Sequence, residues 1–328
     1  MSFKSVLLFM SVFIGSSALA ADSCYLMGET GVHRDTRNSV SNFDLIETQS
    51  CLLRGEEVFT LRSLKFRGYD AKLVVNPETL DSHLVRSSCV ERCSAVSSRD
   101  LGRTNYGSLL SRSDDGSYPM QNDGVTVGSS NKYVALTIDM CPSSKGISQN
   151  VYDKLVSLAK QEGKAIPIGV AMTAAWKDRH SERFDWLKRQ AREGRLEIEW
   201  INHSYHHHYK RDVPLAQNFM RKSGTDVAQE VLGNEISMLQ GGVTPSVFFR
   251  FPGLVSSKSM ISSITDWGLV TLGTQAWLGK GEKAVEGSII LIHGNRNEPS
   301  GEVKFMDYVQ VMDRQGQEFG SLYDVFYN

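Results

Sequence analysis

The chain has 328 residues, of which 41% are hydrophobic and 22% are charged, so it can bury one large core or a large and a small one. This composition excludes a disordered chain. Lys and Arg total 36 against 37 Asp and Glu, and the resulting formal net charge of -1 gives no electrostatic basis for binding nucleic acid.

The first 20 residues have the features of a secretory signal peptide. Lys4 precedes an apolar run from Val6 to Ile14, and small residues follow up to Ala20. We therefore predict a signal peptide over residues 1–20 and export to the periplasm or the extracellular space. The apolar run is too short to span a bilayer, and no later stretch reaches about 18 apolar residues, so no transmembrane segment is expected.

The five cysteines are unevenly placed. Cys24, Cys51, Cys89 and Cys93 lie in the first third of the chain, whereas Cys141 stands alone. Four clustered cysteines in an exported chain indicate two disulfides, and the sequence leaves all three pairings open. A zinc knuckle at Cys89 and Cys93 is a weaker alternative, because the spacing of that pair is not repeated.

Two segments precede the main body of the chain. Residues 21–100 contain short β-like runs, such as 57–61 and 71–75, separated by turn residues, and predict a small β-rich accessory domain held by disulfides. Residues 101–131 are rich in Ser, Gly, Asp and Asn and show little periodicity. We predict a linker there, followed by a second domain over residues 132–328.

From residue 132 onward, apolar runs typical of buried strands alternate with helical patterns. The strand-like runs are 133–138, 165–172, 196–200, 246–251 and 288–292. Three helices are indicated by apolar residues on one face, each followed by Gly: Val151, Leu155 and Leu158; Phe184, Leu187 and Ala191; Leu232, Ile236 and Leu239. This alternation predicts a parallel β/α architecture, either open or closed into a barrel.

Polar side chains follow four of these strands. Asp139, a histidine-rich run at 202–208, Arg250 and His293 each stand at a strand end, where the loops that build active sites converge. His203 and His207 are four residues apart, so on a helical turn both imidazoles would project from one face and hold one metal ion.

The ordered set of motifs resembles a known family. Thr137-Ile138-Asp139, His203-Ser204-x-x-His207, Arg250-Phe251-Pro252-Gly253 and Leu291-Ile292-His293 resemble the motifs of polysaccharide deacetylases, also called carbohydrate esterase family four or NodB-homology domains. The resemblance covers residues 132–328. It implies a distorted β/α barrel of the NodB type, here preceded by the β-rich domain, that removes acetyl groups from N-acetylated sugars with a divalent metal, usually Zn²⁺.

The resemblance also implies roles for single residues. His203 and His207 would hold the metal, Asp139 would be the general base and His293 the general acid, while Arg250 would pair with Asp139 and keep it ionised. The residues expected at the substrate are Trp277, Pro252 and Cys141, with the backbone N–H of Cys141 or its neighbour facing the oxyanion. Hydrolysis of a poorly electrophilic amide requires these three functions: Lewis acid, base and acid.

Two positions depart from the family pattern. Met140 stands where a second aspartate usually binds the metal, and a thioether is a poor zinc ligand beside two imidazoles. The third ligand is left open between water, Asp139, His206, His208 and Cys141. Ala276 replaces the acid that usually precedes Trp277, so the group that tunes the base or Arg250 is absent or comes from elsewhere.

The sequence therefore predicts a metal-dependent N-deacetylase of an amino-sugar polymer, with peptidoglycan favoured over a chitin-like glycan because of the predicted export. One alternative is a catalytically silent sugar-binding protein that kept the barrel but lost the metal. Another is an amidase for small substrates. Bound zinc with acetate release separates the first from the second, and release of ammonia or another acid would indicate the third. The oligomeric state is not predicted.

Overall fold

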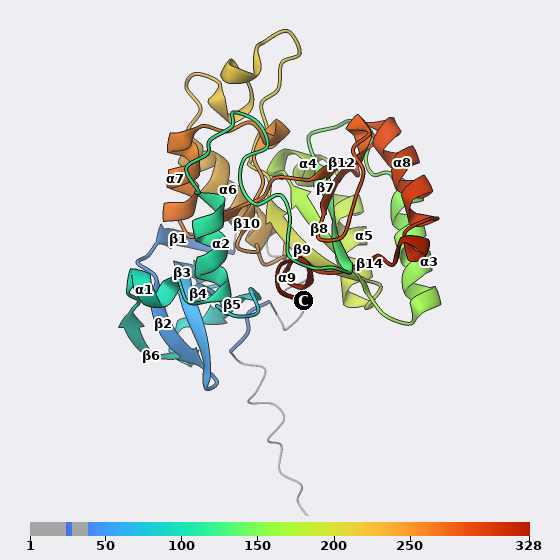
Figure 1. Ribbon diagram of the computed structural model, residues 1–328. Coiled ribbons are helices and arrows are strands. Elements are labelled where there is room, and N and C mark those ends of the chain that lie inside the picture. Colours follow the sequence, from blue (N-terminus) through green and yellow to red (C-terminus); the bar gives the residue numbers. More distant parts are fainter. Residues whose placement is uncertain (1–23, 28–38) are drawn as a thin grey trace, which may run out of the picture.

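The computed structural model describes residues 24–27 and 39–328, which form an antiparallel sheet followed by a larger parallel sheet with helices (Figure 1). The signal peptide predicted over residues 1–20 lies outside the described residues. Within the described part, none of the helices is both long enough and apolar enough to cross a membrane.

The N-terminal sheet is antiparallel and has the strand order β5-β4-β3-β2-β6. β3 is long enough for β2 to pair with its first half and β1 with its second half. Disulfides join Cys24 to Cys89 and Cys51 to Cys93, which resolves the open pairing and confirms the β-rich, disulfide-containing prediction. The strands are β1 (Val40–Leu45), β2 (Gln49–Leu53), β3 (Glu56–Phe66), β4 (Tyr69–Val75), β5 (Ser82–Arg86) and β6 (Val90–Ala95).

The second sheet is parallel and curls into a half-barrel, as the predicted NodB-type fold requires. Its order is β11-β10-β9-β8-β7-β13-β12, and β14 pairs with the start of β7. The run expected as a strand at 246–251 forms a ladder only over two residues. The strands are β7 (Tyr133–Met140), β8 (Ile166–Met172), β9 (Leu196–Asn202), β10 (Phe248–Phe249), β11 (Val270–Thr271), β12 (Ala276–Trp277), β13 (Ile289–His293) and β14 (Glu318–Phe319).

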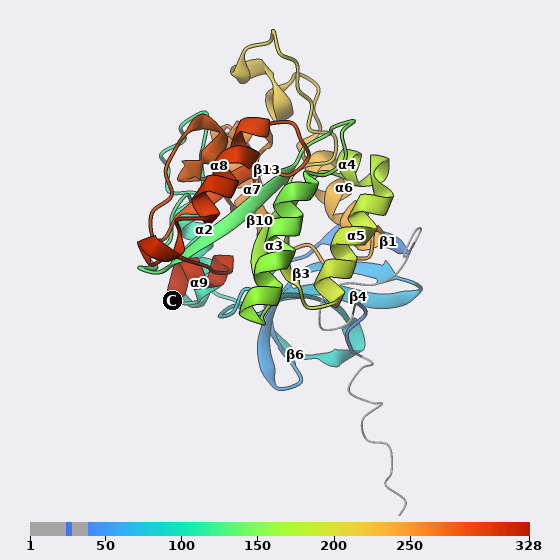
Figure 2. The same cartoon turned by 90° about the vertical axis from the view of Figure 1, so that its right-hand side faces the viewer.

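Helices cover the sheet, and three of them run side by side across its outer face: α3, α5 and α8 (Figure 2). The three helices predicted from apolar spacing correspond to α3, α5 and α6. The helices are α1 (Ser98–Leu101), α2 (Asn105–Ser113), α3 (Gln149–Glu162), α4 (Ala174–Arg179), α5 (Ser181–Arg192), α6 (Val227–Gln240), α7 (Lys258–Asp266), α8 (Pro299–Val309) and α9 (Leu322–Tyr327).

The alternation of side chains along β7 decides which residues can take part in a site. Leu136, Ile138 and Met140 belong to the core under α3, α5 and α8. Ala135 belongs to the core on the opposite, inner face of the curled sheet. Because side chains alternate along a strand, Asp139 points to the inner face while Met140 packs outward.

The segment predicted to be a linker, residues 101–131, contains the helix α2. α2 begins after Thr104, whose hydroxyl accepts a hydrogen bond from the backbone N–H of Gly107. Tyr106 and Leu109 are buried in the inner core, and the Tyr106 hydroxyl donates to the carbonyl of Gly268 at 2.6 Å. The apolar residues of α2 span too few turns for their spacing to distinguish a helix from a loop in the sequence.

A pocket opens at the amino ends of β8 and β9, where the parallel sheet faces the N-terminal sheet. Asp81, His83 and Glu199 are among its lining residues. Burial, with a smaller effect of Asp81, raises the pKa of Glu199 to about 8. The predicted site residues lie at the opposite, carboxyl ends of the same strands, so this pocket is separate from them.

Candidate active site

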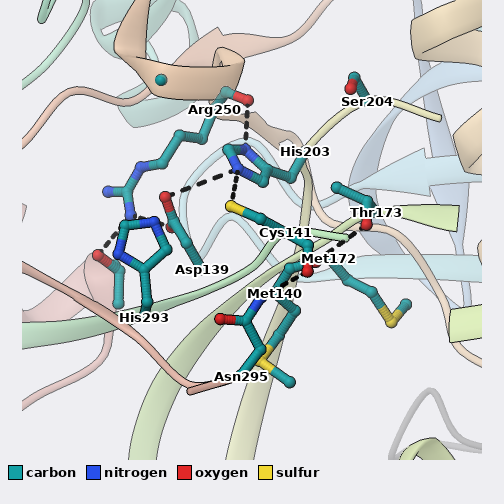
Figure 3. A network of polar contacts seen from close by, with 12 residues as sticks. Asp139, Met140, Cys141, Met172, Thr173, His203, Ser204, Arg250, His293 and Asn295 are labelled. Atoms are coloured by element: carbon teal, nitrogen blue, oxygen red, sulfur yellow. Dashed lines mark hydrogen bonds and ion pairs between the residues drawn. The ribbon is translucent and has the colours of Figure 1, made fainter. Parts of the chain in front are cut away.

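The parallel register brings the predicted polar residues to one end of the sheet. His293 pairs with Asp139 across β13 and β7, and Asn202 pairs with Met172 and with Phe249 across β8, β9 and β10. His203 and Arg250 each follow one of these paired positions. Figure 3 shows the side chains of Asp139, Cys141, His203, Arg250 and His293 converging on one space.

Asp139 and Arg250 form a buried ion pair in the centre of this group. Arg250 Nη1 donates to Asp139 Oδ1 at 2.9 Å and to Thr137 Oγ1 at 2.6 Å, while Nη2 donates to the carbonyl of Gly273 at 3.0 Å. Burial alone would raise the pKa of Asp139, but Arg250, assisted by His203 and His293, holds that pKa below its ordinary value. Asp139 is therefore an ionised carboxylate held in a fixed orientation.

His203 and His207 meet in the way the sequence requires, although not on a helical turn. The chain after β9 is a loop in which Ser204 has φ 69° and His207 has φ 51°, so both positions are left-handed. The helical interpretation was wrong because the side chain of Asn202 accepts the Ser204 N–H and redirects the chain. The two imidazole rings still lie 5.0 Å apart, centroid to centroid.

The tautomer of His203 follows from its hydrogen bond. Nδ1 lies 2.9 Å from the carbonyl oxygen of Arg250, which can only accept, so Nδ1 carries the proton. In the neutral ring the lone pair is then on Nε2, which faces Cys141 Sγ at 3.5 Å and Asp139 Oδ2 at 3.7 Å. A carbonyl that fixes the ring in this way is the usual outer partner of a metal-binding histidine.

Cys141 follows Asp139 by two residues and shares its side of the chain. It is the free cysteine among the described residues, and it is buried. Burial disfavours its thiolate, but His207 and His293 outweigh that effect and hold the pKa of Cys141 well below its ordinary value. Met140 points away, and its Sδ accepts the Tyr152 hydroxyl at 3.2 Å in the outer core.

His293 has an acidic partner that the sequence analysis missed. Its Nδ1 lies 3.2 Å from Glu298 Oε2, and the indole N–H of Trp277 donates to the same carboxylate at 2.9 Å. Burial lowers the pKa of His293, but Cys141 and Glu298 outweigh it and raise that pKa well above the ordinary value. The family pattern has an acid immediately before Trp277, where this chain has Ala276. Here Glu298, at the start of α8, places a carboxylate beside Trp277 instead. The sequence could have indicated Glu298 only by its position in the loop after the strand that ends at His293.

In the deacetylase expected from the sequence, where His293 is the general acid, replacing Glu298 by Gln should lower acetate release and change its pH dependence. Without the carboxylate the pKa of His293 falls, so the protonated form needed in a general acid is lost at a lower pH. The alkaline limb of the kcat/KM profile should therefore move to lower pH, with kcat reduced about tenfold, as for lost outer partners of catalytic groups. An unchanged alkaline limb would show that Glu298 has no effect on the acid.

Gly279 offers a matched control for that variant. A Cβ added at Gly279 would lie 2.0 Å from Glu298 Oε2, so Gly279→Ala displaces the carboxylate without removing its charge. We expect this variant to show a smaller shift of the alkaline limb than Glu298→Gln.

The remaining predicted residues lie beside this group or apart from it. Trp277 is half-buried against His293, with ring centroids 5.8 Å apart. Pro252 opens a 3-10 turn after Arg250 and is buried. His206 and His208 turn away from His203 toward Glu230, and His206 Nδ1 lies 2.7 Å from Glu230 Oε1.

The residues present fit a divalent metal. Cys141, His203 and His207 each offer a ligand atom within 4.8 Å of the other two. The Nε2 atom of His207 is buried and has no hydrogen-bond partner, which is costly for an imidazole unless a ligand takes that position. Two imidazoles with a sulfur or oxygen donor are a donor set that zinc accepts.

Comparisons with known proteins point to one family. Residues 126–272 match the family model described as polysaccharide deacetylase. This range contains Asp139, His203, His207 and Arg250, whereas Trp277 and His293 lie beyond it.

Similar solved structures include two bacterial and one fungal protein. A family 4 carbohydrate esterase from Bacillus anthracis is 19% identical, with 67% of this chain and 90% of that chain covered and a TM-score of 0.45. The family 4 carbohydrate esterase PdaA of Bacillus subtilis is 17% identical, with coverages of 76% and 92% and a TM-score of 0.45. The chitin deacetylase of the fungal pathogen Colletotrichum lindemuthianum is 16% identical, with coverages of 63% and 93% and a TM-score of 0.43.

Proposed function

We propose that the domain to which the polysaccharide deacetylase model matches hydrolyses the N-acetyl groups of an amino-sugar polymer, with peptidoglycan as the substrate. The observation that supports this reaction best is the buried Asp139–Arg250 pair, which faces the imidazoles of His203 and His293 at the carboxyl ends of the strands. The choice of peptidoglycan over a chitin-like glycan depends on the predicted export of the chain, with which its two disulfides are consistent.

Asp139 is the general base of the proposed reaction. Its carboxylate is kept ionised by Arg250, and Oδ2 remains open toward the space between His203 and Cys141. In this role it takes a proton from a water molecule, whose oxygen then forms a bond with the carbonyl carbon of the acetamide. The backbone N–H of Cys141 is our candidate donor to the oxyanion that develops.

His293 is the general acid. Its Nδ1 faces Glu298, which leaves Nε2 for the leaving nitrogen of the substrate. When the carbon–nitrogen bond breaks, His293 donates a proton to that nitrogen, so the products are acetate and the free amine of the sugar. Trp277, held by Glu298 beside His293, is placed to pack against the acetyl group.

A divalent metal, for which we propose Zn²⁺, would be held by His203 and His207. When bound, it would act as a Lewis acid on the carbonyl oxygen and lower the pKa of water. Arg250 contributes twice, since its guanidinium orients Asp139 and its carbonyl oxygen fixes the tautomer of His203.

Acetate release tests this function. Purified protein is incubated with acetylated peptidoglycan and with chito-oligosaccharides, with zinc supplied and with chelator, and acetate and bound metal are measured. We expect acetate from peptidoglycan with zinc, its loss with chelator, and its loss in His203→Ala. Intact protein that binds no metal and releases no acetate from either glycan would instead support a silent sugar-binding protein, and ammonia or another acid released from small amides would support an amidase.

A further inference from the structure

We propose that Cys141 supplies a thiolate as the third protein ligand of the metal, so that the centre is formed by Cys141, His203 and His207. This inference deepens the proposed function and rests on it for the metal. In the family pattern an aspartate at the position of Met140 binds the metal. This chain lacks that carboxylate, and we assign its role as a ligand to Cys141.

The two residues before Cys141, Asp139 and Met140, make other contacts and are less suited to bind the metal. Met140 lies in the outer core with its sulfur on Tyr152, so its side chain is on the wrong face of β7. Asp139 has one carboxylate oxygen on Arg250, and it shares a compact group with Cys141 and His293 rather than with both histidines of the loop. Among the described residues, one group of possible metal ligands contains both His203 and His207, and its third member is Cys141. The ligand atoms of the three lie within 4.8 Å of one another.

The distances suit one ion. Zinc binds sulfur at about 2.3 Å and imidazole nitrogen at about 2.0–2.1 Å, so a tetrahedral angle places the two donor atoms about 3.5 Å apart. Cys141 Sγ and His203 Nε2 are 3.5 Å apart. The proton of His203 is fixed on Nδ1 by the carbonyl of Arg250, so Nε2 is the atom with a free lone pair toward this position.

The chemistry of the pocket agrees with this assignment. His207 Nε2 is buried without a hydrogen-bond partner, and metal binding would satisfy it. The Cys141 sulfur lies within 4.8 Å of a ring nitrogen of both His203 and His207, and sulfur with two imidazole nitrogens is a donor set that zinc accepts. Three protein ligands are also the number found at catalytic zinc sites, and with Cys141 in this role Asp139 stays available as the base.

Cobalt replacement tests the ligand directly, independently of activity. The purified full-length protein is freed of metal, loaded with Co²⁺, and its absorption spectrum is recorded. We expect a near-ultraviolet sulfur-to-cobalt charge-transfer band in the wild type. The band should be absent from Cys141→Asp, which we expect to keep the ion through oxygen, and should persist in Met140→Leu. Of the two other candidate groups among the described residues, that of His206, His208 and Glu230 contains no sulfur and cannot produce the band. The group of Asp139, Cys141 and His293 shares the sulfur of Cys141, so the band should also be lost in His207→Ala if the ion lies between the two loop histidines.

The outcomes separate this inference from the proposed function. Bound Co²⁺ without the band in the wild type would overturn the thiolate ligand even if acetate were released. The band in a protein that releases no acetate would support the ligand and contradict the deacetylase. Failure of the wild type to bind Co²⁺ would also overturn the ligand. Because the decisive spectrum is that of the wild type, poor folding of a variant would not remove the test.

Discussion

Asp139→Asn is expected to lower kcat/KM for acetate release by about 10²–10⁴-fold, the usual contribution of a general base. The amide keeps the shape of the side chain and can still accept a hydrogen bond from Arg250 Nη1, but it cannot take a proton from water. Steady-state acetate release by the wild type and the variant, at saturating zinc, measures the effect. Activity within about threefold of the wild type would remove Asp139 from the role of base.

The same change is expected to destabilise the protein. Arg250 is fully buried, so neutralising Asp139 leaves its charge without a counterion, at a cost of about 3–5 kcal/mol in the free energy of unfolding. Since the folded pKa of Asp139 is depressed, this stabilisation is present above the carboxyl's ordinary pKa and is lost as the pH falls through the lower, folded value. Activity must therefore be compared under conditions where both proteins are folded.

Glu199→Gln is the matched control. Glu199 is also a carboxylate on the inner part of the parallel sheet, but it lies in the pocket at the opposite end of the strands. Burial keeps its pKa at about 8, so it is largely protonated at neutral pH and Gln resembles its ordinary state. We expect unchanged acetate release, so an equal loss in both variants would indicate a general effect on the sheet.

The strand pattern predicted the part of the site that depends on local sequence. The register of β7, β9, β10 and β13 brings Asp139, His203, Arg250 and His293 to one end of the sheet, whereas the outward packing of Met140 was seen only in the structure. The positions of the four polar residues follow from buried runs and from the rule that parallel strands present their carboxyl ends together.

The missed features depend on contacts between distant segments or on a local backbone turn. Glu298 reaches His293 and Trp277 only because α8 starts beside β12 and β13, and no periodic signal marks it. The disulfide partners of Cys51 and Cys24 depend on the pairing of β2 with β6 and on a bridge beside Cys24. The loop of His203 and His207 was taken for a helical turn because a four-residue spacing does not reveal the left-handed positions at Ser204 and His207.

A buried ion pair, beside the apolar contacts, connects the N-terminal sheet to the rest of the protein. Arg62 in β3 binds Glu235 in α6, with Nε to Oε2 at 2.9 Å and Nη2 to Oε1 at 3.1 Å. The exposed fractions of the two side chains are 1% and 0%. Arg62 Nη1 also donates to the carbonyl of Trp267 at 2.7 Å, so one guanidinium connects β3 to α6 and to the end of α7.

Arg62→Met is therefore expected to lower the free energy of unfolding by about 3–5 kcal/mol, because it leaves Glu235 buried without a partner. Urea unfolding followed by circular dichroism measures the change. Lys65→Met is the control on the same strand, since Lys65 and Asp70 form an exposed pair whose loss should cost less than about 1 kcal/mol. Adding Glu235→Leu to Arg62→Met should recover much of the loss, because it removes the unpaired charge. Equal stability of Arg62→Met and the wild type would show that this pair does not hold the N-terminal sheet to α6.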